Sequence, residues 1–221
     1  MSFRRLFRRP TAPSMAKIIL GLGNPGPEYI NTRHNLGFMC LSDLAKDLGS
    51  SFDKKEGLAR TSHATISEVP VLLARSQTYM NLSGDTAAAL TAKYHLGPED
   101  LIVIHDDLDL PLGHIRAKRG GGSGGHRGVG SVMNELGSAD FIRLRLGIGR
   151  PTANHQSEKG EAVIDYVLDR FSEAESKIVT VVMSRAAQAL KTVVTKGLEQ
   201  AIQELSQPPS TKTSTQNTEV K

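Results

Sequence analysis

Continuous apolar runs alternate along the chain with stretches in which apolar residues recur at helical spacing. The runs at 18–22 and 101–104 have the length and continuity of strands buried in the middle of a sheet. At 36–48 the apolar residues have helical spacing, and Gly49 follows them as a signal for the end of a helix. This alternation of buried strands and amphipathic helices predicts an α/β fold.

The middle of the chain adds a strand pair, a helix and a further strand. Residues 64–66 and 69–73 are typical of short strands around Pro70, which predicts a hairpin or a sheet edge. An alanine-rich helix is expected at 85–94. At 141–148 apolar residues alternate with arginines, which predicts a strand with a basic face.

Helices joined by loops are expected in the remaining segments, and no internal repeat is found. The predicted elements are a mobile glycine-rich loop at 120–128, a helix at about 129–136, a loop at 154–160, a short amphipathic turn at 165–171, and a helical pattern at 173–205 that forms one helix or two meeting near Gly197. We therefore predict a single α/β domain at 15–205, with a mixed, mostly parallel twisted sheet and helices on both faces.

Length and composition suit one domain of this kind. The chain has 221 residues, of which 38% are hydrophobic, enough for one sizeable core. No apolar run approaches the roughly 20 residues that span a bilayer, and the first residues lack the apolar centre of a secretory signal. The single cysteine, Cys40, excludes an internal disulfide framework. We expect a soluble, cytoplasmic monomer without a membrane partner.

The two ends of the chain differ from the domain between them. Residues 1–14 contain four arginines and no acidic residue, and 206–221 are polar. Neither segment can bury a core, so both are predicted to be disordered. The arginine-rich start resembles a transit peptide or a disordered arm. We favour an extension without catalytic importance, because Met15 stands just before the first strand and offers an alternative start.

Positive charge is concentrated in one part of the domain. The formal net charge is +4, and without the four N-terminal arginines the basic and acidic residues balance. Between positions 113 and 150 the cations far outnumber the two acidic residues. These cations are Arg116, Lys118, Arg119, Arg127, Arg143, Arg145 and Arg150. The segment is typical of a phosphate-contacting surface, although a solvated face balanced by neighbours would have the same charges.

Two glycine motifs suggest chemistries for which the context is wrong. Gly21-x-Gly23-x-x-Gly26 matches a dinucleotide fingerprint, but two prolines in the same turn remove backbone N–H donors that a pyrophosphate needs. Ser123 has the spacing of a hydrolase nucleophile elbow. It follows a basic segment and lies among glycines, whereas a nucleophile must be held rigidly beside its base.

A cluster of acidic residues follows the strand at 101–104. His105, Asp106, Asp107 and Asp109 offer ligands for a divalent metal. On an extended segment Asp107 and Asp109 share one face and Asp106 lies on the other, so the three carboxylates are not expected to converge. We predict no metal and favour a pair between a carboxylate and a histidine.

Polar clusters beside the apolar elements could meet at one rim of the sheet. They are residues 24–34, residues 79–81, Asp106 and residues 126–127. Without a reactive cysteine or a placed serine, a histidine base oriented by a carboxylate would activate water directly, which suits an ester. His34 is the candidate because of its polar neighbours. The other histidines, His63, His95, His114 and His155, are expected to be packed or surface residues.

Four motifs occur in order along the domain. They are Gly-Leu-Gly-Asn-Pro-Gly-x-x-Tyr-x-x-Thr-Arg-His-Asn-x-Gly from Gly21, Thr-Tyr-Met-Asn-Leu-Ser-Gly from Thr78, His-Asp-Asp-Leu-Asp-Leu-Pro-x-Gly from His105 and Gly-Gly-x-Gly-Gly-His-x-Gly from Gly121. Over about residues 17–205 the chain resembles the bacterial peptidyl-tRNA hydrolase family. The resemblance implies an enzyme that cleaves the ester between a peptide and the 3′ ribose of tRNA, which frees tRNA stranded when peptides leave the ribosome.

The resemblance also implies roles for single residues. His34 would be the general base that acts on water, Asp106 would keep it in its basic form, and Asn24 would favour N-blocked esters. The implied contacts to the tRNA end and the peptide are Tyr29, Tyr79, Met80, Asn81 and His126. No cofactor is implied, and the implied partners are peptidyl-tRNA and the large ribosomal subunit.

One residue departs from the family's pattern. The family commonly has asparagine after the loop histidine, where this chain has Arg127. We expect this guanidinium to reach a phosphate. Noncatalytic relatives of the same fold serve as RNA-splicing cofactors, so an inactive RNA-binding protein is the alternative. The presence of both His34 and Asp106 favours an enzyme.

Overall fold

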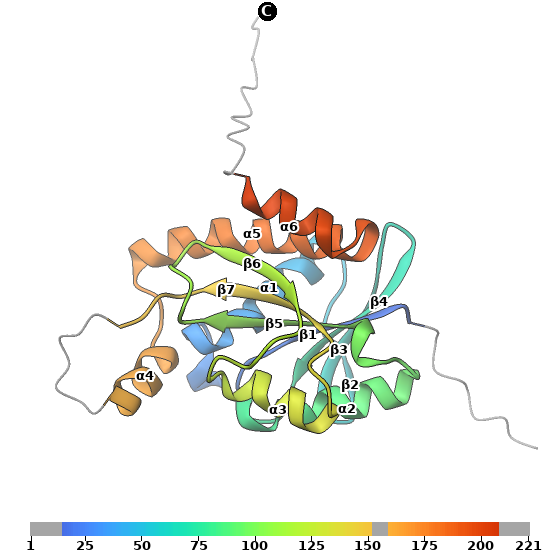
Figure 1. The fold of residues 1–221 in the computed structure, drawn as a ribbon, viewed down its shortest axis with the longest axis horizontal. Helices are drawn as coiled ribbons and strands as arrows, with labels where there is room; N and C mark the ends of the chain where they lie inside the picture. The colour runs from blue at the N-terminus through green and yellow to red at the C-terminus, as the bar shows by residue number, and fades with distance from the viewer. Residues whose placement is uncertain (1–14, 152–158, 208–221) are drawn as a thin grey trace, which may run out of the picture.

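One twisted sheet forms the centre of the computed structural model, which describes residues 15–151 and 159–207 (Figure 1). Its strands are β1 (Lys17–Gly21), β2 (Lys54–Glu56), β3 (Ala59–Ile66), β4 (Val69–Ser76), β5 (Leu101–Asp107), β6 (Ile115–Arg119) and β7 (Ile142–Gly147). Its helices are α1 (Leu36–Asp47), α2 (Ser83–Tyr94), α3 (Arg127–Leu136), α4 (Lys159–Leu168), α5 (Glu173–Lys196) and α6 (Leu198–Ser206). The predictions for 1–14, 152–158 and 208–221 lie outside the described residues.

The strands have the order β2-β3-β4-β1-β5-β7-β6, with four parallel strands in the middle. β3 pairs with β4 and β6 pairs with β7 in the antiparallel direction, and β2 continues the antiparallel edge beside β3. The apolar runs of β1 and β5 are fully buried, as expected for central parallel strands. The prediction of a mixed, mostly parallel α/β fold is confirmed.

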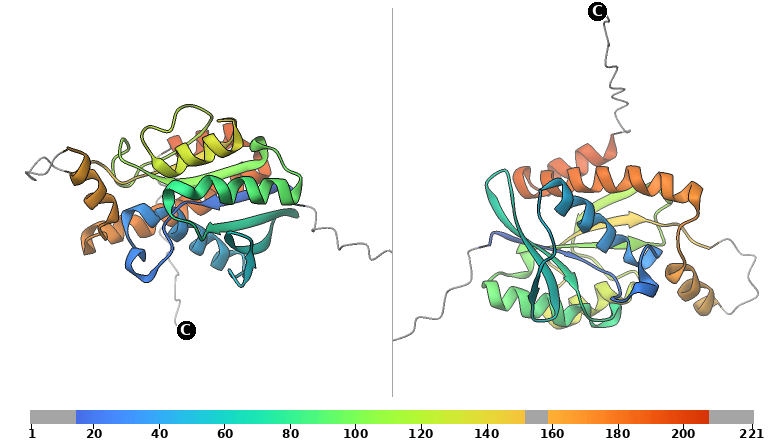
Figure 2. Two further views of the ribbon diagram at one scale, coloured as in Figure 1. Left: turned by 90° about the horizontal axis from the view of Figure 1, so that it is seen from below. Right: turned by 180° about the vertical axis from the view of Figure 1, so that it is seen from behind.

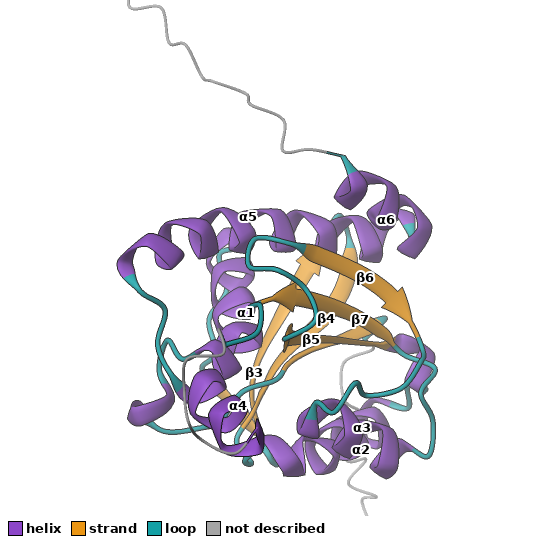
Figure 3. Cartoon of the chain, turned by 60° about the vertical axis from the view of Figure 1, so that its left-hand side comes forward, coloured by secondary structure: helices purple, strands orange, loops and turns teal. Residues whose placement is uncertain are grey.

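Helices cover both faces of the sheet and give it two apolar cores. α1, α5 and α6 lie on one face, and α2 and α3 lie on the other (Figures 1 and 3). Leu41 of α1 and Leu190 of α5 are fully buried in the first core, and Val129 of α3 packs in the second. Each helix therefore buries one apolar stripe against the sheet.

A close approach of α1 to the sheet places the segment before it. A Cβ atom on Gly37 would lie 2.5 Å from the carbonyl oxygen of Ile104 and 2.6 Å from that of Leu22, so only glycine fits there. The first turn of α1 thus rests on the carboxyl ends of β1 and β5. The preceding 3-10 turn η2 (Arg33–Asn35), which carries His34, is held at the same end of the sheet.

Two strands were not predicted from the sequence. β2 contains only charged residues, and β6 lies in the segment that was interpreted through its cations. β6 does alternate, because Ile115 and Ala117 are buried while Arg116 is exposed. Such a short alternating segment becomes a strand because the longer β7 offers it an edge.

The structure corrects the sequence prediction in two further places. Residues 154–158 of the expected loop lie outside the described part of the chain, but 159 and 160 already belong to helix α4. The same helix continues to Leu168 and so replaces the first part of the turn expected at 165–171. The hairpin at 64–73 is confirmed, but Pro70 does not mark a sheet edge, because β4 lies between β3 and β1. Pro70 is the second residue of β4, and its carbonyl accepts a hydrogen bond from Ala16 at 2.9 Å.

Helix α5 is long and apolar enough to cross a membrane by length and composition, although it contains no continuous apolar run of that length. Half of its most apolar window is buried inside the protein. The buried side chains, among them Val182 and Leu190, pack in the core beside α1. This amphipathic burial is what a core helix of an α/β domain requires. The pattern break at Gly197 separates α5 from α6, in line with the two-helix alternative.

Candidate active site

A cavity of about 640 Å³ opens at the carboxyl ends of β1 and β5, where the strand order changes direction. Such a switch point is where open α/β sheets usually bind their ligands. The predicted site residues that line it are Asn24, His34, Tyr79, Met80, Asn81, Asp106, His126 and Arg127. Tyr29 lies outside this set, with its ring edge-on to Tyr79 at a centroid distance of 6.5 Å. The polar clusters therefore do meet, although their roles remain predictions.

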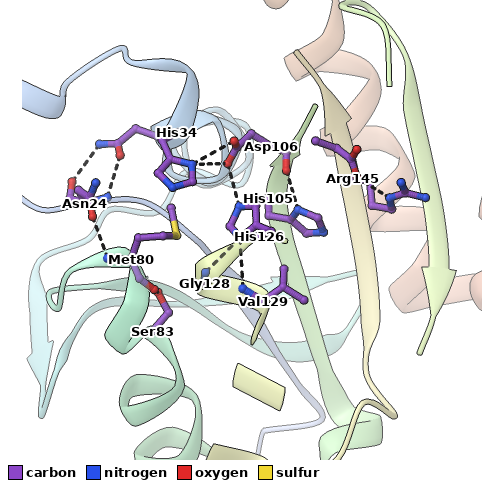
Figure 4. A network of polar contacts seen from close by, with 12 residues as sticks. Asn24, His34, Met80, Ser83, His105, Asp106, His126, Gly128, Val129 and Arg145 are labelled. Atoms are coloured by element: carbon purple, nitrogen blue, oxygen red, sulfur yellow. Dashed lines mark hydrogen bonds and ion pairs between the residues drawn. The ribbon is translucent and has the colours of Figure 1, made fainter. Parts of the chain in front are cut away.

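His34 and Asp106 form the centre of the site (Figure 4). The Nδ1 atom of His34 lies 3.0 Å from both carboxylate oxygens of Asp106, which is only 2% exposed. Burial alone would raise the pKa of Asp106, but the charges and hydrogen bonds of two histidines hold it well below its usual range. The ionised carboxylate accepts a hydrogen bond from His34 Nδ1–H, which leaves the lone pair of Nε2 free.

The same carboxylate fixes the basicity of His34. Burial lowers the pKa of His34, but the negative charge of Asp106 and the hydrogen bond to it outweigh burial and raise the pKa above its ordinary value of 6.5. The cation of Arg127 acts in the opposite direction. A histidine in this setting can take a proton from water near neutral pH.

His126 approaches Asp106 from the other side of the cavity. Its Nε2 lies 3.0 Å from Asp106 Oδ1, and its Nδ1 accepts hydrogen bonds from the backbone N–H groups of Gly128 and Val129 at 3.1 and 3.2 Å. The ring thus caps the start of α3, and its proton must sit on Nε2. Both ring nitrogens are engaged within the protein, which differs from the substrate contact implied by the resemblance.

The cluster of His34, Asp106 and His126 was also tested as a metal site, since its ligand atoms lie within 4.8 Å of one another. A metal bound to His126 Nε2 would need that nitrogen unprotonated while Nδ1 still accepts two N–H bonds. A neutral imidazole cannot meet both demands. The three residues therefore fit a hydrogen-bonded relay around one carboxylate better than a metal centre.

The other acidic residues at the end of β5 and just after it pair with different arginines. Asp107 Oδ2 accepts a hydrogen bond from Arg145 Nε at 2.6 Å, and Asp109 pairs with Arg150. This divergence is what the alternation along the segment predicted. His105 packs beneath His126 at 4.8 Å between ring centroids, and burial lowers its pKa to about 3, so it stays neutral.

Asn24 is fixed by bonds on both sides. Its backbone N–H and C=O pair with the side-chain amide of Asn35 at 2.8 and 3.0 Å. Its Oδ1 accepts the backbone N–H of Met80 at 2.8 Å, which leaves the amide nitrogen as the end available to a ligand. Met80 is buried beside it, whereas Tyr79 and Asn81 are exposed at the mouth. The first two sequence motifs are thus joined by one hydrogen bond.

Arg33 anchors the segment that carries His34. Its guanidinium binds Glu175 through two contacts of 3.0 and 3.1 Å, donates to the Arg170 carbonyl at 2.9 Å and stacks on Tyr166 at 4.3 Å. These partners belong to α4, α5 and the connection between them. Figure 2 shows α4 close to the turn before α1. Sequence reasoning assigned Arg33 no role, because its partners lie far along the chain.

Comparisons with known proteins show the family of this chain. The profile of the family described as Peptidyl-tRNA hydrolase matches residues 18–215. The peptidyl-tRNA hydrolase of Dehalococcoides mccartyi strain 195 is 49% identical over 163 residues, which cover 74% of this chain and 85% of that relative. That of Aquifex aeolicus is 48% identical over 164 residues, 74% of this chain and 82% of that relative. The chain belongs to the peptidyl-tRNA hydrolase family.

A solved member of the peptidyl-tRNA hydrolase family has the same fold. The crystal structure from Acinetobacter baumannii is 33% identical, with a TM-score of 0.79 over 88% of this chain and 97% of that chain. The resemblance drawn from the four motifs is therefore confirmed.

Two parts of the cavity were not predicted from the sequence of this peptidyl-tRNA hydrolase family member. The first is an apolar wall on α4, formed by Val163, Ile164, Val167 and Leu168. The helical spacing of these residues was the available signal, but 165–171 was interpreted as a turn. The second is the group of Lys118, Arg143 and Arg145, which had been noted only as part of a basic segment.

Arg143 shows that a charged residue in a basic segment need not be exposed in the fold. It is 3% exposed, and its guanidinium donates to the carbonyls of Gly120 and Gly122, the latter at 2.8 Å. It thereby holds the glycine-rich loop against β7. The basic face predicted for 141–148 is present, but the loop covers part of it.

Proposed function

We propose that this chain hydrolyses the ester of peptidyl-tRNA with His34 as the general base. The pairing of His34 Nδ1 with the buried Asp106 carboxylate carries the proposal, because it leaves Nε2 as the basic nitrogen in the cavity. Membership of the peptidyl-tRNA hydrolase family supports the substrate class. The intact pair of His34 and Asp106 also favours an enzyme over an inactive RNA-binding protein, which would not need this pair.

His34 and Asp106 handle the proton transfers of the reaction between water and the ester. His34 Nε2 takes a proton as the water oxygen bonds to the ester carbonyl carbon, and the carbonyl oxygen becomes negative. When the tetrahedral intermediate collapses, the bond to the ribose 3′ oxygen breaks and His34 returns its proton to that oxygen. Asp106 stays ionised and stabilises the imidazolium that forms in between. The products are a peptide acid and tRNA.

The amide and apolar groups of the cavity suit a peptide of varied sequence. Asn24 and Asn81 offer amides that can bond to a peptide backbone whatever its side chains. Met80 and the apolar wall of α4 offer packing without specific hydrogen bonds. Tyr29 and Tyr79 lie edge-on at the rim, where they would contact the tRNA end.

RNA phosphates would be bound on the face formed by β6 and β7. Arg116 lies opposite Arg145 and Lys118 lies opposite Arg143 in the antiparallel register, so these four cations share one face of the sheet. Asp107 is the acid paired with Arg145 there. We call these four residues the β6–β7 basic face. An excess of positive charge at this place suits the backbone of the acceptor stem.

The expected setting of the reaction completes the proposal. The enzyme would act as a monomer in the cytoplasm, on peptidyl-tRNA that has left the large ribosomal subunit or remains on it. An inactive RNA-binding protein remains the competing function. It would bind tRNA through the β6–β7 basic face without releasing peptide.

The test compares N-acetyl-aminoacyl-tRNA with the unblocked form. We expect His34→Ala to lower turnover of the blocked substrate by on the order of 10² to 10⁴-fold while tRNA binding is largely retained. His95→Asn is the matched control, since His95 is exposed, lies outside the cavity and has a left-handed φ of 56°, which asparagine tolerates. Full activity of His34→Ala would refute the base assignment, and loss in Ser123→Ala instead would indicate a serine hydrolase.

A further inference from the structure

Arg127 occupies a place in the site that the phosphate contact expected from the sequence does not explain. It is the first residue of α3 and follows directly on His126, whose ring lies 5.1 Å from that of His34. Its side chain is exposed and lines the cavity that contains His34 and Asp106. The cation therefore lies in the same cavity as the candidate base.

The neighbouring arginines of the cavity are already engaged. Arg143 donates to two loop carbonyls, Arg145 pairs with Asp107, and Arg150 pairs with Asp109. Within the described part of the chain, no carboxylate lies within 4.0 Å of the Arg127 guanidinium. Arg127 is thus an arginine with donors left for a ligand beside the general base.

We propose that Arg127 is a catalytic residue that donates hydrogen bonds to the oxyanion of the tetrahedral intermediate. This inference rests on the proposed role of His34. The negative charge appears on the former carbonyl oxygen when water adds, and it disappears when the bond to the ribose oxygen breaks. Arg127 transfers no proton, because a guanidinium stays charged throughout. A cation beside a developing negative charge stabilises it electrostatically.

The electrostatic effect of Arg127 on the pKa of His34 is consistent with their place in one cavity. The Arg127 cation lowers the pKa of His34, against the larger raising effect of Asp106. It disfavours the imidazolium but keeps the base unprotonated to lower pH. The oxyanion forms in the same step and is negative. The attraction between the Arg127 cation and the oxyanion therefore offsets the repulsion between Arg127 and the His34 imidazolium.

The phosphate role and the oxyanion role predict different losses. A residue that binds RNA phosphate contributes to affinity for long RNA and to its dependence on salt. A residue that stabilises the oxyanion contributes to kcat on any ester, including a short one that lacks the acceptor stem. Arg116 and Lys118 of the β6–β7 basic face already supply cations for the acceptor stem. The observations therefore favour the oxyanion for Arg127.

The experiment uses Arg127→Asn and Arg127→Lys on two substrates. One is N-acetyl-aminoacyl-tRNA, and the other is an N-acetyl-aminoacyl ester of the trinucleotide CCA. We expect Arg127→Asn to lower kcat on both by on the order of ten- to a hundredfold, with little change in KM. Its acid limb should move to higher pH, because the cation that opposes protonation of His34 is gone. Arg127→Lys should restore part of kcat and the pH profile.

Two controls separate the possible outcomes. Lys177→Gln removes one charge from α5, where Lys177 is 76% exposed, and should change neither substrate's kinetics. If Arg127→Asn raises KM for the tRNA or for both substrates and leaves kcat on the short ester intact, the phosphate role is correct and the inference is wrong. If His34→Ala remains active, the proposed function itself fails, whatever Arg127 does.

Discussion

Asp106 is the residue on which the site depends, because two imidazoles bond to it from different segments. His34 comes from the turn before α1 and His126 from the start of α3. One buried carboxylate thus selects the proton position of both rings. His34 keeps a free lone pair on Nε2, whereas both ring nitrogens of His126 form hydrogen bonds within the protein. The two histidines therefore differ in function although both contact the same acid.

The pH dependence of turnover follows from the pKa of His34. This pKa is raised above 6.5, so activity should fall on acidification through a pH above that value, where the base becomes protonated. Asp106→Asn removes the raising charge and leaves burial, so the limb should move to lower pH. Its kcat should fall by on the order of 10² to 10⁴-fold. A profile of kcat from pH 5 to 9 that kept its limb in Asp106→Asn would contradict this account.

His126 should matter for stability as well as for rate. His126→Ala removes the cap of α3 and one donor to the buried Asp106, at a cost of about 1–3 kcal/mol in the free energy of unfolding. His126→Asn can still cap the helix, so it should recover part of the stability without restoring the full rate. Urea unfolding and kcat measure the two effects separately. Equal losses in both variants would show that the cap contributes nothing.

At the scale of elements, the turn that carries His34 is joined to the C-terminal helices. A bridge between Thr32 and Arg170 and the ion pair between Arg33 and Glu175 connect it to the segment between α4 and α5. α4 also supplies the apolar wall of the cavity. The base and the peptide wall are therefore positioned by one set of contacts. The guanidinium is almost buried at 8% exposure, where such a pair has little competition from water.

Arg33→Lys tests this connection. Lysine keeps the charge but cannot reproduce the two contacts to Glu175 together with the bond to the Arg170 carbonyl. We expect about 2–3 kcal/mol of lost stability and a lower kcat, since His34 is the next residue. Glu173→Gln is the control on the same helix, because Glu173 is 91% exposed. A variant that unfolds at the wild-type urea concentration would show that the contacts are dispensable.

At the scale of the whole molecule, charge is arranged by the sheet. β6 and β2 are the two edges, and the basic face lies at the β6 edge beside the cavity. The lysines of β2 lie at the opposite edge and are exposed. The chain's small net charge therefore conceals a local excess on one side. Such a placement can steer a polyanion towards the site even when the total charge is low.

Salt dependence of tRNA binding tests this arrangement. In a His34→Ala background, where substrate is not consumed, Lys118→Gln should weaken tRNA binding and reduce the slope of log K against log salt by about 0.7–0.9. Lys54→Gln is the matched control, since it removes the same charge at the β2 edge. Equal changes in slope for the two variants would mean that the RNA does not prefer the β6–β7 basic face.

Local pattern alone determined much of this protein. The continuous apolar runs predicted β1 and β5, the helical spacing predicted α1, and the alanine-rich segment predicted α2. Gly197 marked the break between α5 and α6. These features depend on neighbours within a few residues, so the sequence contains the whole signal. The four polar motifs likewise identified the family, because each is a local string of residues.

Only the tertiary structure decided which distant groups share a bond. Asp106 meets His34 across 72 positions and His126 across 20, and Arg33 meets Glu175 across 142. β6 is a strand because β7 lies beside it, and Arg143 is covered because the glycine loop folds over it. Strand order and helix packing fix these contacts, and neither is encoded in any one stretch. The sequence therefore specified most of the elements and the candidate base, while the assembled sheet decided which groups the base and its carboxylate contact.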